Sequence, residues 1–140
     1  MLALPPRHDF RDLRLTYADV LDRSRRLAHV LADAGLGARS ERDGLGGHES
    51  HQDHIGLYLH NGNEYLEGML GAYAARVAPF NVNYRYVAEE LLYLLRDSGA
   101  RGIVYHARFA PVLAEVLDQL PELTLLLQVA DESGEALLDG

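Results

Sequence analysis

Residues 55–91 constrain the fold of this chain most, because two short apolar segments there flank a helical one. Residues 55–60 and 77–82 are short, apolar and β-prone, as expected of strands covered on both faces. Between them, Asn61 is the expected N-cap of a helix, a position that favours Asn. A strand that leads through a helix to the next strand forms a parallel pair with a right-handed crossover. The stretch therefore predicts a β-α-β unit.

The helix that follows Asn61 carries two further signals. Glu64 stands three residues later, which is a variant of the capping box with Asn in place of Ser or Thr. Five apolar residues then recur at helical spacing and predict the buried face: Leu66, Met69, Leu70, Tyr73 and Val77.

An amphipathic helix is predicted ahead of this unit, over residues 17–34. Thr16 is its expected N-cap, with Asp19 three residues later as a weaker capping box. Gly35 is expected to end the helix, since Gly is favoured just past a C-terminus. Residues 1–13, a polar lead that contains two adjacent prolines, predict an irregular arm.

The chain continues the alternation after the central unit. Residues 87–97 and 109–120 show helical spacing, and residues 102–106 and 124–130 predict strands. Strands that alternate with helices indicate an α/β fold with a mainly parallel sheet, βαβαβαβ order and helices on both faces, preceded by the amphipathic helix. Residues 131–140 predict an irregular end.

Composition narrows the function classes. At 140 residues the chain is one domain or part of one. Its net charge of −8 argues against a nucleic-acid surface, which needs clustered positive charge. Cysteine is absent, which excludes disulfides and fits a cytoplasmic location, and no apolar run reaches bilayer length. All 13 basic side chains are arginine, so no mechanism that needs a lysine can run on this chain alone.

Residues 37–54 predict a mobile loop, because they lack periodicity and are rich in Gly, Ser and charge. The loop contains His48, His51 and His54, whose three-residue spacing would bring imidazoles together on a helix. The segment has no apolar face to hold a helix in place, and metal ligands need such support. We therefore expect no metal site there.

Ligands bind at the carboxyl ends of the strands in open parallel sheets. Those ends carry His60, Asn61, Asn81, Asn83 and His106. His60 is a candidate acid, base or polar contact, and Asn61 a candidate ligand contact. The alternatives are that His60 packs at the strand end against the backbone and that Asn61 only caps the helix.

A turn that follows the second strand adds another candidate. Tyr84 and Tyr86 flank Arg85, an arrangement that suits an anion pocket or a cation-π stack. The alternative is a loop packed on a neighbouring domain. The sequence contains no GxGxxG, GxxxxGK[ST] or GxSxG motif, and no pair of carboxylates stands out. It therefore predicts no catalytic, cofactor-binding or metal-ligating residue.

Two segments together resemble a known family: LTYADVLDRSRRLAHVLADAGLG, and the run from DHIGLYLHNGNEYLEGMLGAYAARVAPFNVNYRYVAEEL to ARFAPVL. They resemble the N-terminal part of AMP-forming acyl-CoA synthetases, the fatty-acid–CoA ligases of the adenylate-forming superfamily. The similarity extends from about Leu15 to Leu138, and NVNYRYV is most similar to actinobacterial ligases for fatty acids or steroid side-chain acids. The resemblance implies that residues 1–140 are a partial N-terminal subdomain of that fold.

The resemblance also implies a reaction. The family activates a carboxylic acid with ATP and Mg²⁺, and coenzyme A then displaces AMP. The Ser/Thr/Gly-rich phosphate loop and the catalytic lysine of the family have no matching position here, so we expect a fragment that is inactive alone. Two alternatives stay open: one half of a split ligase completed in trans by the missing remainder, or a non-catalytic binding module that retained the fold. The acid substrate and the oligomeric state do not follow from the sequence.

Overall fold

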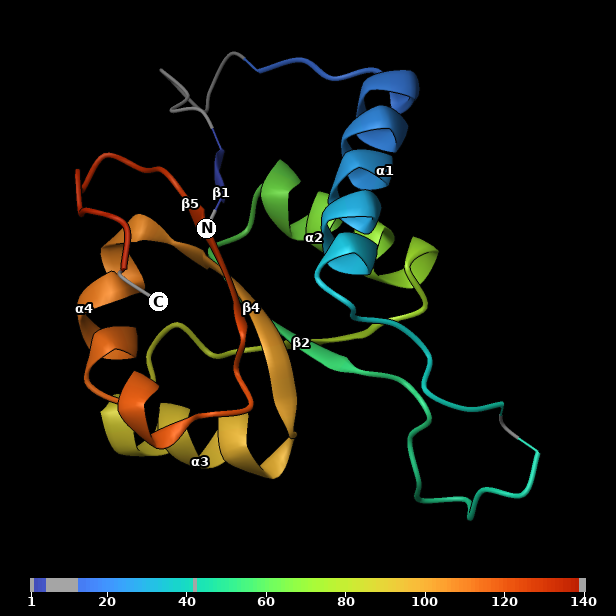
Figure 1. The fold of residues 1–140 in the computed structure, drawn as a ribbon. Helices are drawn as coiled ribbons and strands as arrows, with labels where there is room; N and C mark the ends of the chain where they lie inside the picture. Colours follow the sequence, from blue (N-terminus) through green and yellow to red (C-terminus); the bar gives the residue numbers. More distant parts are fainter. Residues whose placement is uncertain (1, 5–12, 42, 139–140) are drawn as a thin grey trace.

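The computed structural model describes residues 2–4, 13–41 and 43–138 (Figure 1). Along the chain, the strands and helices are β1 (Leu2–Leu4), α1 (Tyr17–Asp33), β2 (His54–Tyr58), α2 (Asn63–Ala74), β3 (Ala78–Asn81), α3 (Ala88–Asp97), β4 (Ala100–His106), α4 (Ala110–Ala114) and β5 (Leu125–Val129). Two short 3-10 helices, Ala107–Phe109 and Leu117–Gln119, flank α4.

The strands form one five-stranded parallel sheet in the order β1-β5-β4-β2-β3. β2 pairs with β3 across the α2 crossover, which confirms the β-α-β unit predicted from the central stretch. In the register of the central pair, Gly56 lies opposite Ile103 and Tyr58 opposite Tyr105. The predicted α/β class with a parallel sheet is confirmed.

Helices cover both faces of the sheet. Along β4, Ile103 and Tyr105 pack with residues of α3 and α4, whereas Val104 packs with residues of α1 and α2. This alternation follows from the strand geometry, in which successive side chains point to opposite faces. Figure 1 shows α1 beside α2 on one side of the sheet and α3 near α4 on the other. The core is therefore two apolar layers, one on each face.

Helix α1 begins and ends where the sequence predicts. The Thr16 hydroxyl accepts a hydrogen bond from the Asp19 N–H at 3.2 Å, and the Asp19 carboxylate accepts one from the Thr16 N–H at 2.8 Å. Gly35, just past the C-cap, has a φ of 77°, a left-handed conformation that glycine adopts without strain.

The prediction of an irregular arm over residues 1–13 is wrong at Leu2–Leu4. These residues form β1, which pairs in parallel with β5. A three-residue strand is too short to show a period of two in the sequence, and β5 offers it an edge of unpaired backbone groups. The remainder of the predicted arm up to residue 12 lies outside the described residues.

Helix α2 differs from its prediction in both its start and its buried face. Its N-cap is Gly62, and Asn61 is exposed one residue earlier, so the expected Asn61 cap is wrong. Three of the five residues predicted to be buried are exposed (Leu66, Leu70 and Tyr73), while Met69 is half-buried and Val77, beyond the helix, is buried.

The buried face of α2 is instead built from small and acidic residues. A Cβ at Gly68 would lie 2.9 Å from a methyl of Leu57 in β2, and a Cβ at Gly71 would lie 2.9 Å from the Ser24 carbonyl oxygen in α1. The glycines therefore let α2 approach the sheet and α1 more closely than larger residues would allow. Because of this close approach, α2 buries the face with Gly68 and Gly71 and leaves the face with Leu66, Leu70 and Tyr73 exposed.

The fourth predicted helix, over residues 109–120, is interrupted. Only Ala110–Ala114 is α-helical, and a turn at Val116 leads into the second 3-10 helix. Of the six apolar positions at helical spacing, Phe109, Leu113, Val116 and Leu120 are buried, and Val112 and Leu117 are half-buried.

A buried carboxylate closes the base of the loop over residues 37–54. Asp53 is 5% exposed; it accepts hydrogen bonds from the Gly37 N–H at 3.0 Å and from Arg39 Nε at 2.5 Å. The guanidinium of Arg101 lies 3.7 Å from the same carboxylate. An antiparallel bridge between Ala38 and Gln52 joins the two ends of the loop. The mobility of the loop between these ends stays a prediction.

In the described part of the chain, no helix combines the length and the apolar character that a bilayer crossing requires.

Candidate functional site

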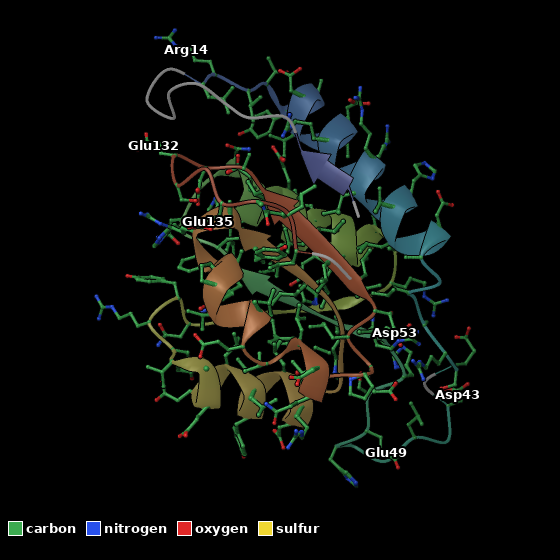
Figure 2. All side chains as sticks on the ribbon, turned by 60° about the vertical axis from the view of Figure 1, so that its left-hand side comes forward. Arg14, Asp43, Glu49, Asp53, Glu132 and Glu135 are labelled. Atoms are coloured by element: carbon green, nitrogen blue, oxygen red, sulfur yellow. The ribbon has the colours of Figure 1, made fainter. Side chains whose placement is uncertain are left out.

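A cavity of about 280 Å³ lies beyond the carboxyl ends of β2, β4 and β5. Its lining comes from the β2–α2 turn, the first turn of α2, the end of β4 and the segment after β5. The lining residues are His60, Asn61, Glu64, His106, Arg108, Asp131 and Glu132. Figure 2 shows Glu132 near Glu135, at the opposite end of the molecule from Asp53. The cavity is therefore at the edge of the sheet where parallel folds bind ligands.

Two histidines, His60 and His106, are among the lining residues. The backbone N–H of His60 donates a hydrogen bond to Nδ1 of His106 at 3.1 Å, so in neutral His106 the ring proton is on Nε2. His106 is 5% exposed. Burial lowers the pKa of His106 below its ordinary value of 6.5, although Glu64 and Asp131 act in the opposite direction. The imidazole of His106 is thus held neutral and presents an N–H donor.

Aromatic rings surround His60. Its ring centroid lies 4.6 Å from that of Tyr84, 5.1 Å from that of Phe109 and 5.8 Å from that of His106. The guanidinium carbon of Arg85 lies 5.6 Å from the centroid of the Tyr84 ring, within cation-π range. The β2–α2 turn and the turn after β3 are therefore joined through the tilted ring contact between His60 and Tyr84.

The segment after β5 adds two carboxylates to the lining, those of Asp131 and Glu132. Asp131 accepts hydrogen bonds from the N–H of Arg108 at 3.0 Å and from the N–H of Ser133 at 2.9 Å, and the Ser133 hydroxyl also donates to it. Partial burial would raise the pKa of Asp131, but the hydrogen bonds from Ser133 and Arg108 outweigh burial and lower it. Asp131 is thus held ionised and fixes the segment after β5 against the end of β4.

The structure brings some of the predicted site residues together and separates others. His60 and Asn61 line the cavity, and Tyr84 and Arg85 lie beside it through their contact with His60. Asn83 closes its own turn, because its side-chain oxygen accepts a hydrogen bond from the Arg85 N–H at 3.0 Å. Asn81 is exposed at the end of β3 and has no place in the cavity lining.

Four lining residues are absent from the sequence-based candidates: Glu64, Arg108, Asp131 and Glu132. Arg108 and Asp131 each follow the end of a strand by two residues. Taking the two or three positions after every predicted strand would have found Arg108, Asp131 and Glu132.

The arrangement suits hydrogen bonding more than chemical transformation. It offers an imidazole donor, an amide, one guanidinium and three carboxylates around a small volume. Over the described residues, no three His, Asp or Glu side chains are grouped so as to hold a metal ion. In the loop at the other end of the molecule, His54 has Nδ1 2.5 Å from the Ser98 carbonyl oxygen and Nε2 2.9 Å from the Ser50 hydroxyl.

Comparison with known proteins identifies relatives for nearly the whole chain. The family model for AMP-binding enzymes matches residues 5–139. A medium-chain acyl-CoA ligase of Mycobacterium avium, named Mig, is 60% identical over 129 residues, which are 92% of this chain and 24% of that protein. A Mycobacterium tuberculosis ligase for medium- and long-chain fatty acids and 3-oxocholest-4-en-26-oate is 37% identical over 124 residues, 89% of this chain and 20% of that protein. The predicted similarity to actinobacterial ligases is confirmed.

Solved structures share the fold. The N-terminal domain of FACL13 from Mycobacterium tuberculosis, with an inhibitor bound, matches with a TM-score of 0.70 and 26% identity, over 84% of this chain and 27% of that one. The anthranilate CoA ligase AuaEII, at 19% identity and a TM-score of 0.72 over 84% of this chain and 20% of that one, shows the fold alone. This chain spans about a quarter or less of the length of the relatives it matches. Because the family model matches nearly every residue, the chain belongs to the AMP-binding enzyme family.

Proposed function

We propose that this chain is the N-terminal part of an ATP-dependent, AMP-forming ligase that joins a medium- or long-chain fatty acid to coenzyme A. The observation that carries the proposal is the 60% identity to the Mycobacterium avium medium-chain ligase over 92% of this chain. The chain corresponds to only 24% of that protein, so the remaining segments of the ligase are needed for the reaction.

The residues present do not fit ATP by themselves. The cavity at the strand ends holds the carboxylates of Glu64, Asp131 and Glu132 against one guanidinium, that of Arg108. This balance of charge repels a polyphosphate, which proteins hold with cations, backbone N–H groups and a metal ion. The chain also has no lysine to neutralise the developing charge. ATP, Mg²⁺ and coenzyme A therefore belong to the complete ligase, and we derive no catalytic step on this chain.

Within the complete ligase, residues 1–140 would serve as a scaffold subdomain. His60, Asn61, Tyr84 and Arg85 are proposed contacts to substrate or to a neighbouring subdomain, because they lie at the carboxyl edge of the sheet. Asn81 and Asn83 stay weaker candidates for the same role. The proposal includes a cytoplasmic location, with which the absence of cysteine agrees.

Acid-dependent ATP–pyrophosphate exchange tests the proposal. In the test protein, this chain replaces the matched 129-residue segment of the Mycobacterium avium ligase. We expect exchange that depends on a medium-chain fatty acid from this chimera, and none from the isolated chain. The same assay on a mixture of the chain with the rest of that ligase measures completion in trans.

Two results would overturn the proposal. One is a chimera that folds but gives no exchange under conditions in which the parent ligase is active. The other is exchange by the isolated chain, because a chain without the phosphate loop and lysine should not form an acyl-adenylate.

A further inference from the structure

The outward face of α2 carries no charge. Its exposed positions are Leu66, Leu70, Tyr73 and Ala74, whereas its two acidic residues, Glu64 and Glu67, are buried. Leu66, Leu70 and Tyr73 are 48%, 40% and 56% exposed. At spacings of four and three residues they lie in one row along the helix, which we call the α2 stripe.

The other long helices direct charged side chains to solvent, although Tyr17 and Leu21 of α1 and Tyr93 of α3 are also exposed. The exposed positions of α1 include Asp19, Asp22, Arg25, Arg26 and Asp33, and those of α3 include Glu89, Glu90, Arg96 and Asp97. A surface helix normally directs its charges to solvent and its apolar side chains to the core. Helix α2 reverses this order, although it lies in the same layer as α1.

The reversal is fixed by contacts on the buried side. Arg23 of α1 places Nε 2.6 Å from a carboxylate oxygen of Glu67, and the Asn63 amide donates to the same oxygen at 2.8 Å. Together with the close approach at Gly68 and Gly71, this ion pair sets the rotation of α2 about its axis. Turning the α2 stripe inward would bury larger side chains where the glycines now allow contact and would break the ion pair. The stripe is therefore exposed by the packing of α2 and not by a displaced helix.

We propose that the α2 stripe is the surface on which the remainder of the ligase packs, the segments that follow this chain in its full-length relatives. This inference rests on the proposed function and adds which face of the subdomain the rest of the protein covers. A row of two leucines and a tyrosine fits an apolar partner surface of the kind that joins subdomains within one chain.

The size of the α2 stripe favours this occupant over a second copy of the chain. Three partly exposed side chains supply far less than the roughly 800 Å² per partner that a stable protein interface buries. A segment of the same polypeptide needs less area, because the covalent connection holds it nearby at high effective concentration. The match to only 24% of the Mycobacterium avium ligase leaves a large segment to fill this role.

Single cysteines test the proposal, because the chain has none of its own. Leu70→Cys and Tyr73→Cys report on the α2 stripe, and Glu89→Cys on the charged face of α3 is the matched control. Each is made in the isolated chain and in the chimera with the rest of the Mycobacterium avium ligase. Maleimide labelling is followed by peptide mass spectrometry at the substituted position, so other cysteines do not interfere. Circular dichroism confirms that each variant folds.

We expect the chimera to label at least about tenfold more slowly than the isolated chain at positions 70 and 73, because covered sites react only after local opening. Position 89 should label equally in both. Equal labelling of the stripe in a chimera that shows acid-dependent exchange overturns this inference and leaves the proposed function standing. Slow labelling of the stripe in a chimera without exchange supports this inference and overturns the proposed function. Fast labelling without exchange overturns both, and protection in the isolated chain that grows with its concentration assigns the stripe to a second copy.

Discussion

The close approach of α2 to α1 at Gly71 and to β2 at Gly68 predicts different outcomes when each glycine is replaced by alanine. Replacing a helical Gly by Ala gains about 1 kcal/mol of helix propensity at either position 68 or position 71. A Cβ at Gly71 would lie 2.9 Å from the Ser24 carbonyl oxygen, 2.9 Å from Leu27 Cδ2 and 3.0 Å from Leu27 Cβ. A Cβ at Gly68 would lie 2.9 Å from one methyl of Leu57, with the next atom of that side chain at 3.6 Å.

The difference lies in what must move. Leu57 can shift its terminal methyl, whereas the Ser24 oxygen belongs to the backbone of α1, so the two helices must separate. Overpacking of this kind costs about 1–3 kcal/mol. After the gain of about 1 kcal/mol in propensity, Gly71→Ala should destabilise the fold by up to about 2 kcal/mol, and Gly68→Ala should leave its stability within about 0.5 kcal/mol of the original.

Urea unfolding of the chain and the two variants measures both changes, with circular dichroism at 222 nm as the signal. The comparison between the variants is the decisive quantity, because helix propensity cancels from it. The reasoning is refuted if Gly71→Ala is as stable as Gly68→Ala, since the contact at Ser24 would then impose no cost.

Three further predictions follow from other contacts. Val87 is the N-cap of α3, and its N–H donates to the Glu90 carboxylate at 3.1 Å, but its side chain has no hydroxyl to complete the capping box. Because Val87 is 61% exposed, Val87→Thr should stabilise the chain by about 0.5–1 kcal/mol in urea unfolding. Unchanged stability would contradict this. Asp53→Asn removes the charge beside Arg39 and Arg101 and should cost about 1.5–3 kcal/mol, whereas Glu49→Gln on the exposed part of the same loop should have no such effect. The pKa of His106 is lowered in the folded state, so as the pH falls through 6.5 the unfolded chain takes up a proton before the folded chain does. The free energy of unfolding should therefore fall from pH 7.5 to 5.5 by more in the original chain than in His106→Gln. Parallel pH profiles of the two proteins would show that His106 does not contribute to the pH dependence of stability.

The order of strands and helices was predictable because it depends on local patterns. Each central strand is a short apolar run, and each helix except α4 has a continuous apolar repeat. The position of β1 was not predictable in this way, because Leu2–Leu4 gains its conformation from β5, more than a hundred residues later. Pairing between distant segments leaves no mark in the pattern of either one.

The buried face of α2 shows a second limit. Hydrophobic spacing indicates which residues form one apolar row on a helix, and it does not show which face of the helix the sheet covers. Leu66, Leu70 and Tyr73 were predicted to be buried from their spacing alone, while the close approach at Gly68 and Gly71 became visible only with the helices in place.

The candidate site was predictable to the extent that it follows one strand. His60 and Asn61 stand two and three residues after the end of β2 and were found by that rule. Glu64 and Asp131 reach the same cavity from α2 and from the segment after β5, and their convergence depends on strand order and on the register that sets His106 opposite Val129.

The order of strands in the sheet also determines when each strand can pair during synthesis. Among the described strands β1 precedes the other four in the chain, yet its partner β5 follows them, and Leu2 pairs with Leu127. At a ribosomal rate of about 5–20 residues per second, residues 3–127 take roughly 6–25 s to appear. Through that interval the first strand is without a partner, while β2, β3 and β4 can already pair. The β1 edge is thus the last part of the sheet to close on the nascent chain, and any release of the chain before residue 125 would leave β1 and the edge of β4 available to chaperones or to other chains.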